Sequence, residues 1–118
     1  MTTSELREAL HGTNEVDLTV IGRRSGQEST RPIWFVEEGD RLLLLPVTGS
    51  DSNWYRNIVK TPEVRLTADG GELSATAKPI DDPASVAEVV EQFRTKYGAD
   101  EVARYYSKQN AAVTVPLS

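Results

Sequence analysis

The sequence predicts a mainly β domain of the α+β class: a six-stranded antiparallel barrel with short helices packed around it. Three observations support this class. Six short segments have strand-like apolar patterns, and turns short enough for hairpins join most of them. The only long helical segment comes late in the chain, and no predicted strand runs into the G-x-G-x-x-G turn of a parallel nucleotide-binding sheet. A chain of 118 residues has the length of one domain, so we expect residues 1–118 to form a single domain.

The first elements are a short helix and a strand. Thr2 and Glu5 have the spacing of a capping box at a helix start. The buried face of this helix would carry Leu6, Ala9 and Leu10. From residue 16 the apolar period becomes two, which predicts a half-buried strand over 16–20. Gly22 and Gly26 then bracket a turn with the sequence GRRSG.

The second and third predicted strands form a hairpin. In the strand over 30–37, alternate residues point to opposite faces, so Ile33 and Phe35 share one face, and Trp34 and Val36 share the other. The segment over 42–47 does not alternate but is apolar nearly throughout. A strand of this kind is buried on both faces. We therefore expect a helix or a second copy of the chain to cover its outer side, which makes a homodimer a reasonable expectation.

The second half of the chain alternates between helices and strands. Ser52 is a suitable N-cap for a helix over 53–60. Two strands, over 64–68 and 73–77, flank a turn of Asp, Gly and Gly and form the clearest hairpin. Asp82 as N-cap and Pro83 at the first position begin the long helix, which a glycine ends after Tyr97. A short helix over 100–107 and a strand over 111–117 complete the predicted order.

Composition excludes several function classes. The net charge is −5, and no basic stripe of the kind that binds nucleic acids is present. Cysteine is absent and His11 is the only histidine, which excludes Cys nucleophiles and metal sites built on several histidines. His11 follows a short helix, away from any motif, so we expect no Ser-His-Asp chemistry. The N-terminus has no signal-peptide pattern and the longest apolar run is far too short to span a membrane, so we expect a cytoplasmic protein.

Two clusters could bind a ligand. Arg23 and Arg24 lie between the glycines of the turn and Arg31 follows soon after, a local positive charge suited to an anion in an acidic chain. Trp54 and Tyr55 begin the helix over 53–60 and could hold a planar ring system. Without further evidence, the arginines could equally be solvated surface residues, and the tryptophan could be part of the core.

Late tyrosines form a third group, comprising Tyr97, Tyr105 and Tyr106. The last two are adjacent and cannot both face inward, so one of them could line a pocket. A phenol can donate a hydrogen bond to a substrate oxygen, although its usual pKa of about 10 makes it a poor base at neutral pH.

Three stretches, taken in order, resemble the deazaflavin-dependent nitroreductase family of split β-barrel oxidoreductases. The matching segments are LTVIGRRSG (18–26), RPIWFVEEGDRLLLLP (31–46) and NWYRNIVKTPEVRL (53–66). Members carry a TTxGRKSG-like turn, a PLWFVxDGDR-like hairpin and a WYxNLxxNPxVxV-like passage from helix to strand. The resemblance runs in register over about 18–77 and more loosely to residue 117.

The resemblance implies a reduced deazaflavin, coenzyme F-420, that transfers hydride to quinones, nitroaromatics or similar planar acceptors. Such chemistry requires no protein nucleophile. The turn would hold the phosphate and acidic tail of the cofactor through Arg23, Arg24, Ser25 and Gly26, with Arg31 adding a cation from another direction. The ring system and the pocket around it would be lined by Pro32, Ile33, Trp34, Val47, Thr48, Trp54, Tyr55 and Asn57.

Some positions depart from the family pattern. Many members have a basic residue where this chain has Glu28 and Ser29, and a small polar residue followed by Lys where it has Val47 and Thr48. A tyrosine that some members place over the acceptor aligns near residue 100, so Tyr97, one turn earlier, is the candidate catalytic residue. No metal ligands are implied.

These departures leave the identity of the cofactor open at this stage. FMN, whose phosphate could use the same turn, is an alternative ligand for the same fold. A binding protein that sequesters a cofactor without turnover is a second alternative. A structural module that dimerises through the strand over 42–47 is a third.

Overall fold

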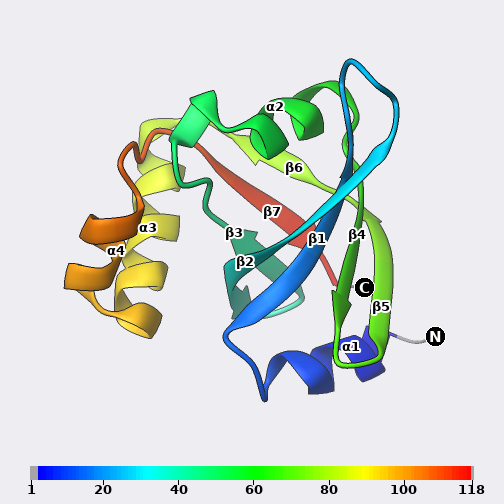
Figure 1. Ribbon diagram of the computed structural model, residues 1–118. Helices are drawn as coiled ribbons and strands as arrows, with labels where there is room; N and C mark the ends of the chain where they lie inside the picture. Colours follow the sequence, from blue (N-terminus) through cyan, green and yellow to red (C-terminus); the bar gives the residue numbers. More distant parts are fainter. Residues whose placement is uncertain (1–2, 118) are drawn as a thin grey trace.

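The computed structural model describes residues 3–117, which form a strongly curled antiparallel sheet with helices at its ends and on one side (Figure 1). The strands are β1 (Glu15–Ile21), β2 (Glu28–Glu38), β3 (Arg41–Leu44), β4 (Glu63–Ala68), β5 (Gly71–Thr76), β6 (Lys78–Ile80) and β7 (Ala112–Pro116). The helices are α1 (Thr3–Leu10), α2 (Asn53–Lys60), α3 (Pro83–Tyr97) and α4 (Ala99–Tyr105), with a 3₁₀ turn, η1 (Gly49–Asp51), before α2. The predicted α+β class and antiparallel split barrel are confirmed.

Within residues 3–117 the sheet has seven strands in the order β5-β4-β1-β2-β3-β7-β6, one more than the sequence predicted. The additional strand is β6, which pairs with β7 through Lys78↔Thr114 and Ile80↔Ala112. It was missed because it is only three residues long, has Pro79 at its centre and follows β5 without a turn. Proline cannot donate to a ladder, so it is placed in short edge strands such as this one.

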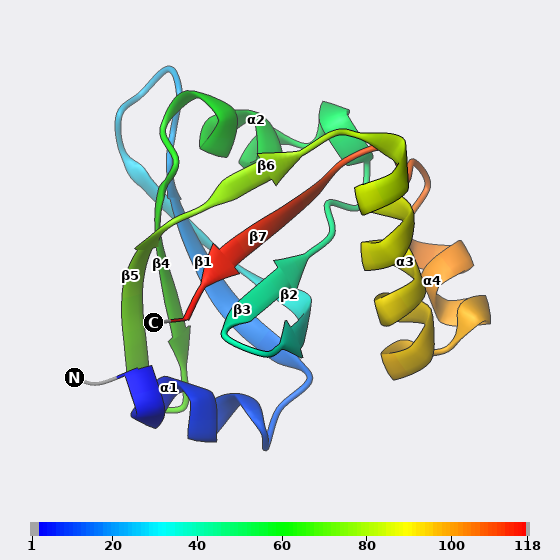
Figure 2. The same cartoon turned by 180° about the vertical axis from the view of Figure 1, so that it is seen from behind.

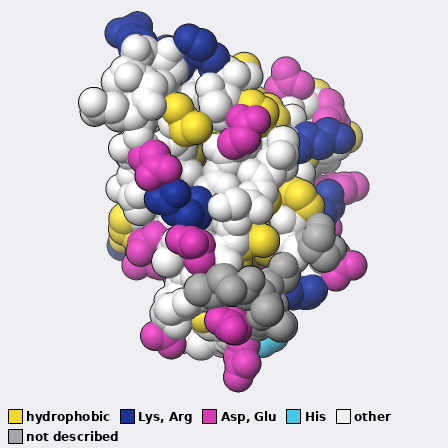
Figure 3. All heavy atoms as spheres, turned by 90° about the vertical axis from the view of Figure 1, so that its right-hand side faces the viewer, with side chains coloured by type: hydrophobic (Ala, Val, Ile, Leu, Met, Phe, Trp, Pro, Cys, Tyr) yellow, Lys and Arg dark blue, Asp and Glu magenta, His cyan; other side chains and the backbone are white. Residues whose placement is uncertain are grey.

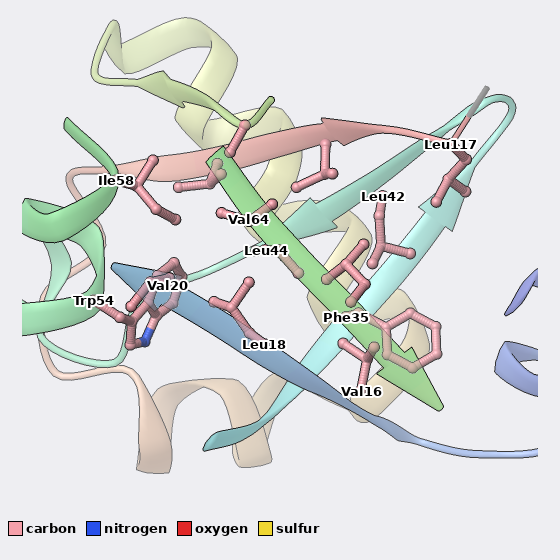
Figure 4. Close-up of a cluster of buried hydrophobic side chains, with 14 of the residues drawn as sticks. Val16, Leu18, Val20, Phe35, Leu42, Leu44, Trp54, Ile58, Val64 and Leu117 are labelled. Atoms are coloured by element: carbon pink, nitrogen blue, oxygen red, sulfur yellow. The ribbon is translucent and has the colours of Figure 1, made fainter. Parts of the chain in front are cut away.

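The inside of the curl holds the main core (Figure 4). Alternate residues of β1, namely Val16, Leu18 and Val20, point into it, which confirms the period-two prediction. Phe35 of β2 and Leu44 of β3 meet them from the neighbouring strands. Trp54 lies beside Val20, where α2 closes the upper end of the curl.

A second core lies on the outer side of β2, β3 and β7, under α3 and α4 (Figure 2). Leu43 and Leu45 point outward from the doubly apolar segment and are almost fully buried there. The helix face that covers them carries Val86, Val89, Val90 and Phe93. The two-sided burial predicted for 42–47 is confirmed over 42–46, but the strand itself ends at Leu44 and Val47 is half-exposed. The cover of this segment is provided by helices of the same chain.

The long helix begins as predicted. The Asp82 carboxylate accepts a hydrogen bond from the Ser85 backbone N–H at 3.0 Å, and Pro83 occupies the first turn. Hydrogen bonds from the side chain and the backbone of Ser85 hold the pKa of the Asp82 carboxyl below its usual value. The cap fixes where α3 starts and hence how its apolar face meets β3.

Helix α1 closes the lower end of the curl with Leu6 and Leu10, both buried. It approaches β5 so closely that a Cβ atom at Gly71 would lie 2.6 Å from the Leu6 Cα, a distance only glycine allows. Thr2, on which the predicted capping box depends, lies outside the described residues. No helix within residues 3–117 is long and apolar enough to cross a membrane.

Candidate functional site

The turn between β1 and β2 is tied to α2 by Arg23. Its backbone N–H and its Nη1 both donate to the Asn57 Oδ1, at 3.1 and 2.8 Å. The ammonium group of Lys60 donates to the Arg23 carbonyl oxygen at 2.7 Å. Asn57 is only 9% exposed, so its amide oxygen is available to the turn and to little else. These bonds fix the turn against the helix that carries Trp54.

Unpaired positive charge gathers at this turn. Seven of the thirteen Lys and Arg side chains form ion pairs with carboxylates among the described residues. Three of the other six, Arg23, Arg24 and Arg31, border a single hollow. Neither Arg24 nor Arg31 has an ion pair or a side-chain hydrogen bond with any described residue. Figure 3 shows Lys and Arg side chains at the top of the molecule, where the turn lies.

Glu28 is the one carboxylate between residues 22 and 33, and it does not neutralise these arginines. Glu28 forms a bidentate pair with Arg65 of β4, both bonds at 2.9 Å, and this pair lowers the pKa of the Glu28 carboxyl. Glu28 borders a different depression, on the outer face of the sheet. Although Glu28 stands where many family members have a basic residue, the electrostatic potential at the turn therefore stays positive.

A groove follows the β2 strand from this turn, and we call it the β2 groove. Its polar half has a volume of about 360 Å³ and includes Arg23, Arg24, Ser25, Ser29, Arg31, Asn53 and Asn57 in its lining. Its apolar half has a volume of about 280 Å³ and is lined by Glu15, Pro32, Ile33, Trp34, Leu45, Val47, Trp54, Tyr105 and Tyr106. Trp54 borders both halves, so the two hollows adjoin at this side chain.

Aromatic rings form the wall of the apolar half. The Trp34 ring stacks on Tyr97 with centroids 4.2 Å apart and planes 8° apart, and Tyr105 meets Trp34 edge-on at 5.1 Å. Val47 and Tyr105 are 49% and 48% exposed, which is unusual for large apolar side chains in this protein. Such exposure next to a hollow is typical of a surface that a planar ligand covers.

Tyr97 lies behind this wall. Its hydroxyl oxygen accepts from the Phe35 N–H at 3.1 Å and lies 2.8 Å from the Phe35 carbonyl oxygen. Burial raises the pKa of Tyr97 to about 12, so the phenol stays neutral. The hydroxyl is thus engaged by the β2 backbone, and Trp34 separates the ring from the groove. This placement does not support the predicted contact between Tyr97 and substrate.

Three other predicted site residues do not line the groove. Gly26, at a φ of +70°, shapes the turn without bordering the hollow. Thr48 lies in the loop before η1, where its carbonyl oxygen accepts from the Asp51 N–H at 3.2 Å. Tyr55 faces a different side of α2 from Trp54 and borders another hollow. Adjacent helical residues are rotated by about 100°, so Trp54 and Tyr55 cannot both face one groove.

The groove also includes residues that the sequence did not assign to it. Glu15, Tyr105 and Tyr106 line the apolar half, and Val20 lines the polar half. The two tyrosines were noticed as a pair of which one could line a pocket. The sequence did not indicate that α4 places both tyrosines against Trp34 of β2.

The arrangement suits a ligand that is anionic at one end and planar and apolar at the other. Free guanidinium groups at the polar half offer forked hydrogen bonds to phosphate or carboxylate. The aromatic wall and Ile33 offer a flat apolar contact of the kind a fused ring needs. The curled antiparallel sheet and this groove together define the class: a split barrel with a site for a ligand of this shape.

Comparison with known proteins gives the family. The model of the F420H(2)-dependent quinone reductase family matches residues 2–117, and the chain belongs to this family. Members transfer hydride from reduced coenzyme F-420 to quinone-type acceptors, so the protein is an oxidoreductase with F-420 as its cofactor. The resemblance and the cofactor predicted from the sequence are confirmed.

Solved structures agree on the fold. An F420-H2-dependent reductase, FDR-A, is 20% identical, with 86% of this chain and 93% of that chain covered and a TM-score of 0.67. The heme storage protein HutZ of Vibrio cholerae is 14% identical, with coverage of 98% and 90% and a TM-score of 0.72. A structure described as a domain-swapped dimer is 20% identical, with coverage of 96% and 98% and a TM-score of 0.67.

Proposed function

We propose that this chain holds coenzyme F-420 in the β2 groove, with the phosphate and acidic tail in the polar half and the deazaflavin ring against Trp54. The observation that carries the proposal is the set of three arginines without carboxylate partners at one end of a groove whose other end is aromatic. Three cations suit a phosphate followed by an acidic tail better than the single phosphate of FMN. The residues present therefore fit the cofactor.

Each part of the groove would have its own task. Arg24 and Arg31 would bind the anionic tail, and Arg23 would hold the turn against α2 while its guanidinium borders the same hollow. Trp54, 5% exposed, would set the plane of the ring. Bound there, F-420 supplies the hydride, and the chain orients the acceptor and excludes water.

The acceptor would enter the apolar half, over Val47 and Tyr105. Tyr105 is half-exposed there and its hydroxyl has no hydrogen-bond partner among the described residues, so it can donate to an acceptor oxygen. We assign Tyr97 a positioning role, because its ring supports Trp34 from behind. The catalytic role predicted for Tyr97 is thereby moved to Tyr105.

The test is acceptor reduction by reduced F-420 with a small naphthoquinone, compared with the rate without protein. Arg24→Glu should raise the KM for F-420 by tenfold or more with little change in kcat, since it reverses one charge on the cofactor tail. Lys78→Glu makes the same change in net charge on the β6 edge strand, away from the groove, and should leave the KM unchanged. Equal effects of the two variants would refute the anion site.

A protein that only sequesters its cofactor would give a different result in the same assay. It would bind F-420 tightly and reduce the naphthoquinone no faster than free cofactor. The expected cytoplasmic location is a further proposal, which fractionation of producing cells tests.

The homodimer expected from the sequence also belongs here as a proposal. Its original basis has gone, because α3 and α4 cover the outer face of β3. The similar structure described as a domain-swapped dimer is what now supports it. Sedimentation of the purified protein would decide between monomer and dimer.

A further inference from the structure

Tyr55 points away from the β2 groove. It is 7% exposed, yet its hydroxyl has no hydrogen-bond partner among the described residues. No side-chain oxygen of the described part of the chain is both sealed from solvent and unpaired, so the hydroxyl opens into the hollow that Tyr55 lines. Buried hydroxyls normally find a partner. This one is available to a ligand.

The hollow lies between α2 and α3, and we call it the α2–α3 hollow. Its volume of about 840 Å³ exceeds that of either half of the β2 groove and falls in the range of small-molecule sites. Val59, Val86 and Val90 form its apolar lining. Val59 is 58% exposed. The other exposed large apolar side chains of the described residues, Val47 and Tyr105, both line the β2 groove.

The charge of the hollow is negative. Asp81 lines it close enough for its charge to act on the Tyr55 hydroxyl, and it has no ion pair with any described residue. Glu91 and Arg94 on the rim pair with each other at 3.4 Å. The unpaired charge of the hollow is thus the Asp81 carboxylate. An occupant without a hydrogen-bond donor would cover this exposed carboxylate and leave it unsatisfied, whereas an ammonium group forms the strongest bond with it.

From this geometry we infer that the α2–α3 hollow is a second small-molecule site, which takes an apolar organic amine in its protonated form. The ammonium group donates to the Asp81 carboxylate and to the Tyr55 hydroxyl oxygen, and the apolar body covers Val59, Val86 and Val90. The site is separate from the β2 groove and does not depend on the function proposed for that groove.

The experiment titrates isotope-labelled protein with naphthylmethylamine and follows the amide chemical shifts. F-420 is present throughout, so that the β2 groove is occupied. Shifts should gather at Val59, Val86 and Val90, and naphthylacetate, the matched anion, should bind far more weakly. Asp81→Asn should weaken amine binding about tenfold, the usual effect of losing a charge-assisted bond. Tyr55→Phe should weaken it severalfold.

Glu91→Gln is the matched control, since it neutralises a carboxylate of the same hollow that already has a partner. Its effect on the amine should be small, and thermal unfolding of all three variants verifies that they fold. Equal losses in Asp81→Asn and Glu91→Gln would overturn the inference, as would equal binding of amine and anion. Shifts confined to the β2 groove would also overturn it. So would shifts at Val59 that depend on protein concentration without the amine, because the hollow would then be a contact between copies.

Discussion

Two adjacent arginines, Arg23 and Arg24, should behave differently when each is replaced by alanine. Both border the polar half of the β2 groove, but only Arg23 is also bonded to α2. Its Nη1 donates to the Asn57 Oδ1 at 2.8 Å, and its guanidinium reaches two oxygens of Asn53 at 3.4 Å. Arg24 has no such bonds within the described part of the chain. Arg23 therefore holds the turn and also borders the groove, whereas Arg24 can act only on a ligand.

The magnitudes follow from these contacts. In Arg23→Ala, the largely buried Asn57 keeps only its bond from the backbone N–H of the turn, which should cost about 1–1.5 kcal/mol of stability. For a domain of this size that corresponds to a fall in Tm of about 3–6 °C. Arg24→Ala should change stability by less than about 0.5 kcal/mol. Both variants should weaken F-420 binding by about tenfold or more, through the loss of one charge-assisted bond.

Thermal unfolding and fluorescence titration with oxidised F-420, on the same preparations, provide the two readouts. The expected pattern is lower affinity in both variants and a lower Tm only in Arg23→Ala. An equal fall in Tm for both variants would refute the division of roles. Unchanged affinity in Arg24→Ala would refute the anion site itself.

Three further outcomes are expected. Tyr105→Phe should lower kcat for naphthoquinone reduction without changing the Tm, whereas Tyr97→Phe should lower the Tm, because the Phe35 N–H loses its acceptor. The folded-state pKa of Tyr97, about 12, exceeds the unfolded value near 10, so the contribution of Tyr97 to stability is complete below pH 10. This contribution is lost as the pH rises from 10 toward 12. Chemical denaturation across that range should show a fall in the free energy of unfolding, and the fall should be smaller in Tyr97→Phe. Gly71→Ala should destabilise the fold by about 1–3 kcal/mol, since its Cβ would meet the backbone of α1 at 2.6 Å; a Tm equal to wild type would contradict this packing.

Most of the fold was predictable because each element obeys local rules. The period-two pattern of β1 and the cap at Asp82 depend on neighbouring residues alone. The doubly apolar β3 required a cover, and the apolar stripe of α3 required a surface. That α3 covers β3 depends on the path of the chain between them, which no local pattern specifies. The surface of a partner subunit would satisfy the same apolar pattern. The short strand at Pro79 was missed because it forms only where β7 offers an edge.

The candidate site was predictable in part for similar reasons. The GRRSG turn identifies Arg23 and Arg24 from local sequence alone, since two glycines bracketing two arginines at a strand end are typical of a turn. The rotation of α2 decides whether Trp54 or Tyr55 faces the groove, and both residues are apolar enough to be buried either way. The entry of Tyr105 into the groove depends on α4 folding back over β2, which no local pattern specifies.

The most direct test of the central claim is an equilibrium titration of the purified protein with oxidised F-420, with FMN in parallel, at low and moderate salt. The arrangement of Arg23, Arg24 and Arg31 predicts that F-420 binds more tightly than FMN and that salt weakens the binding, because exposed cations meet an anionic tail. Tighter binding of FMN, or affinity for F-420 that does not respond to salt, would contradict the assignment of the polar half to that tail.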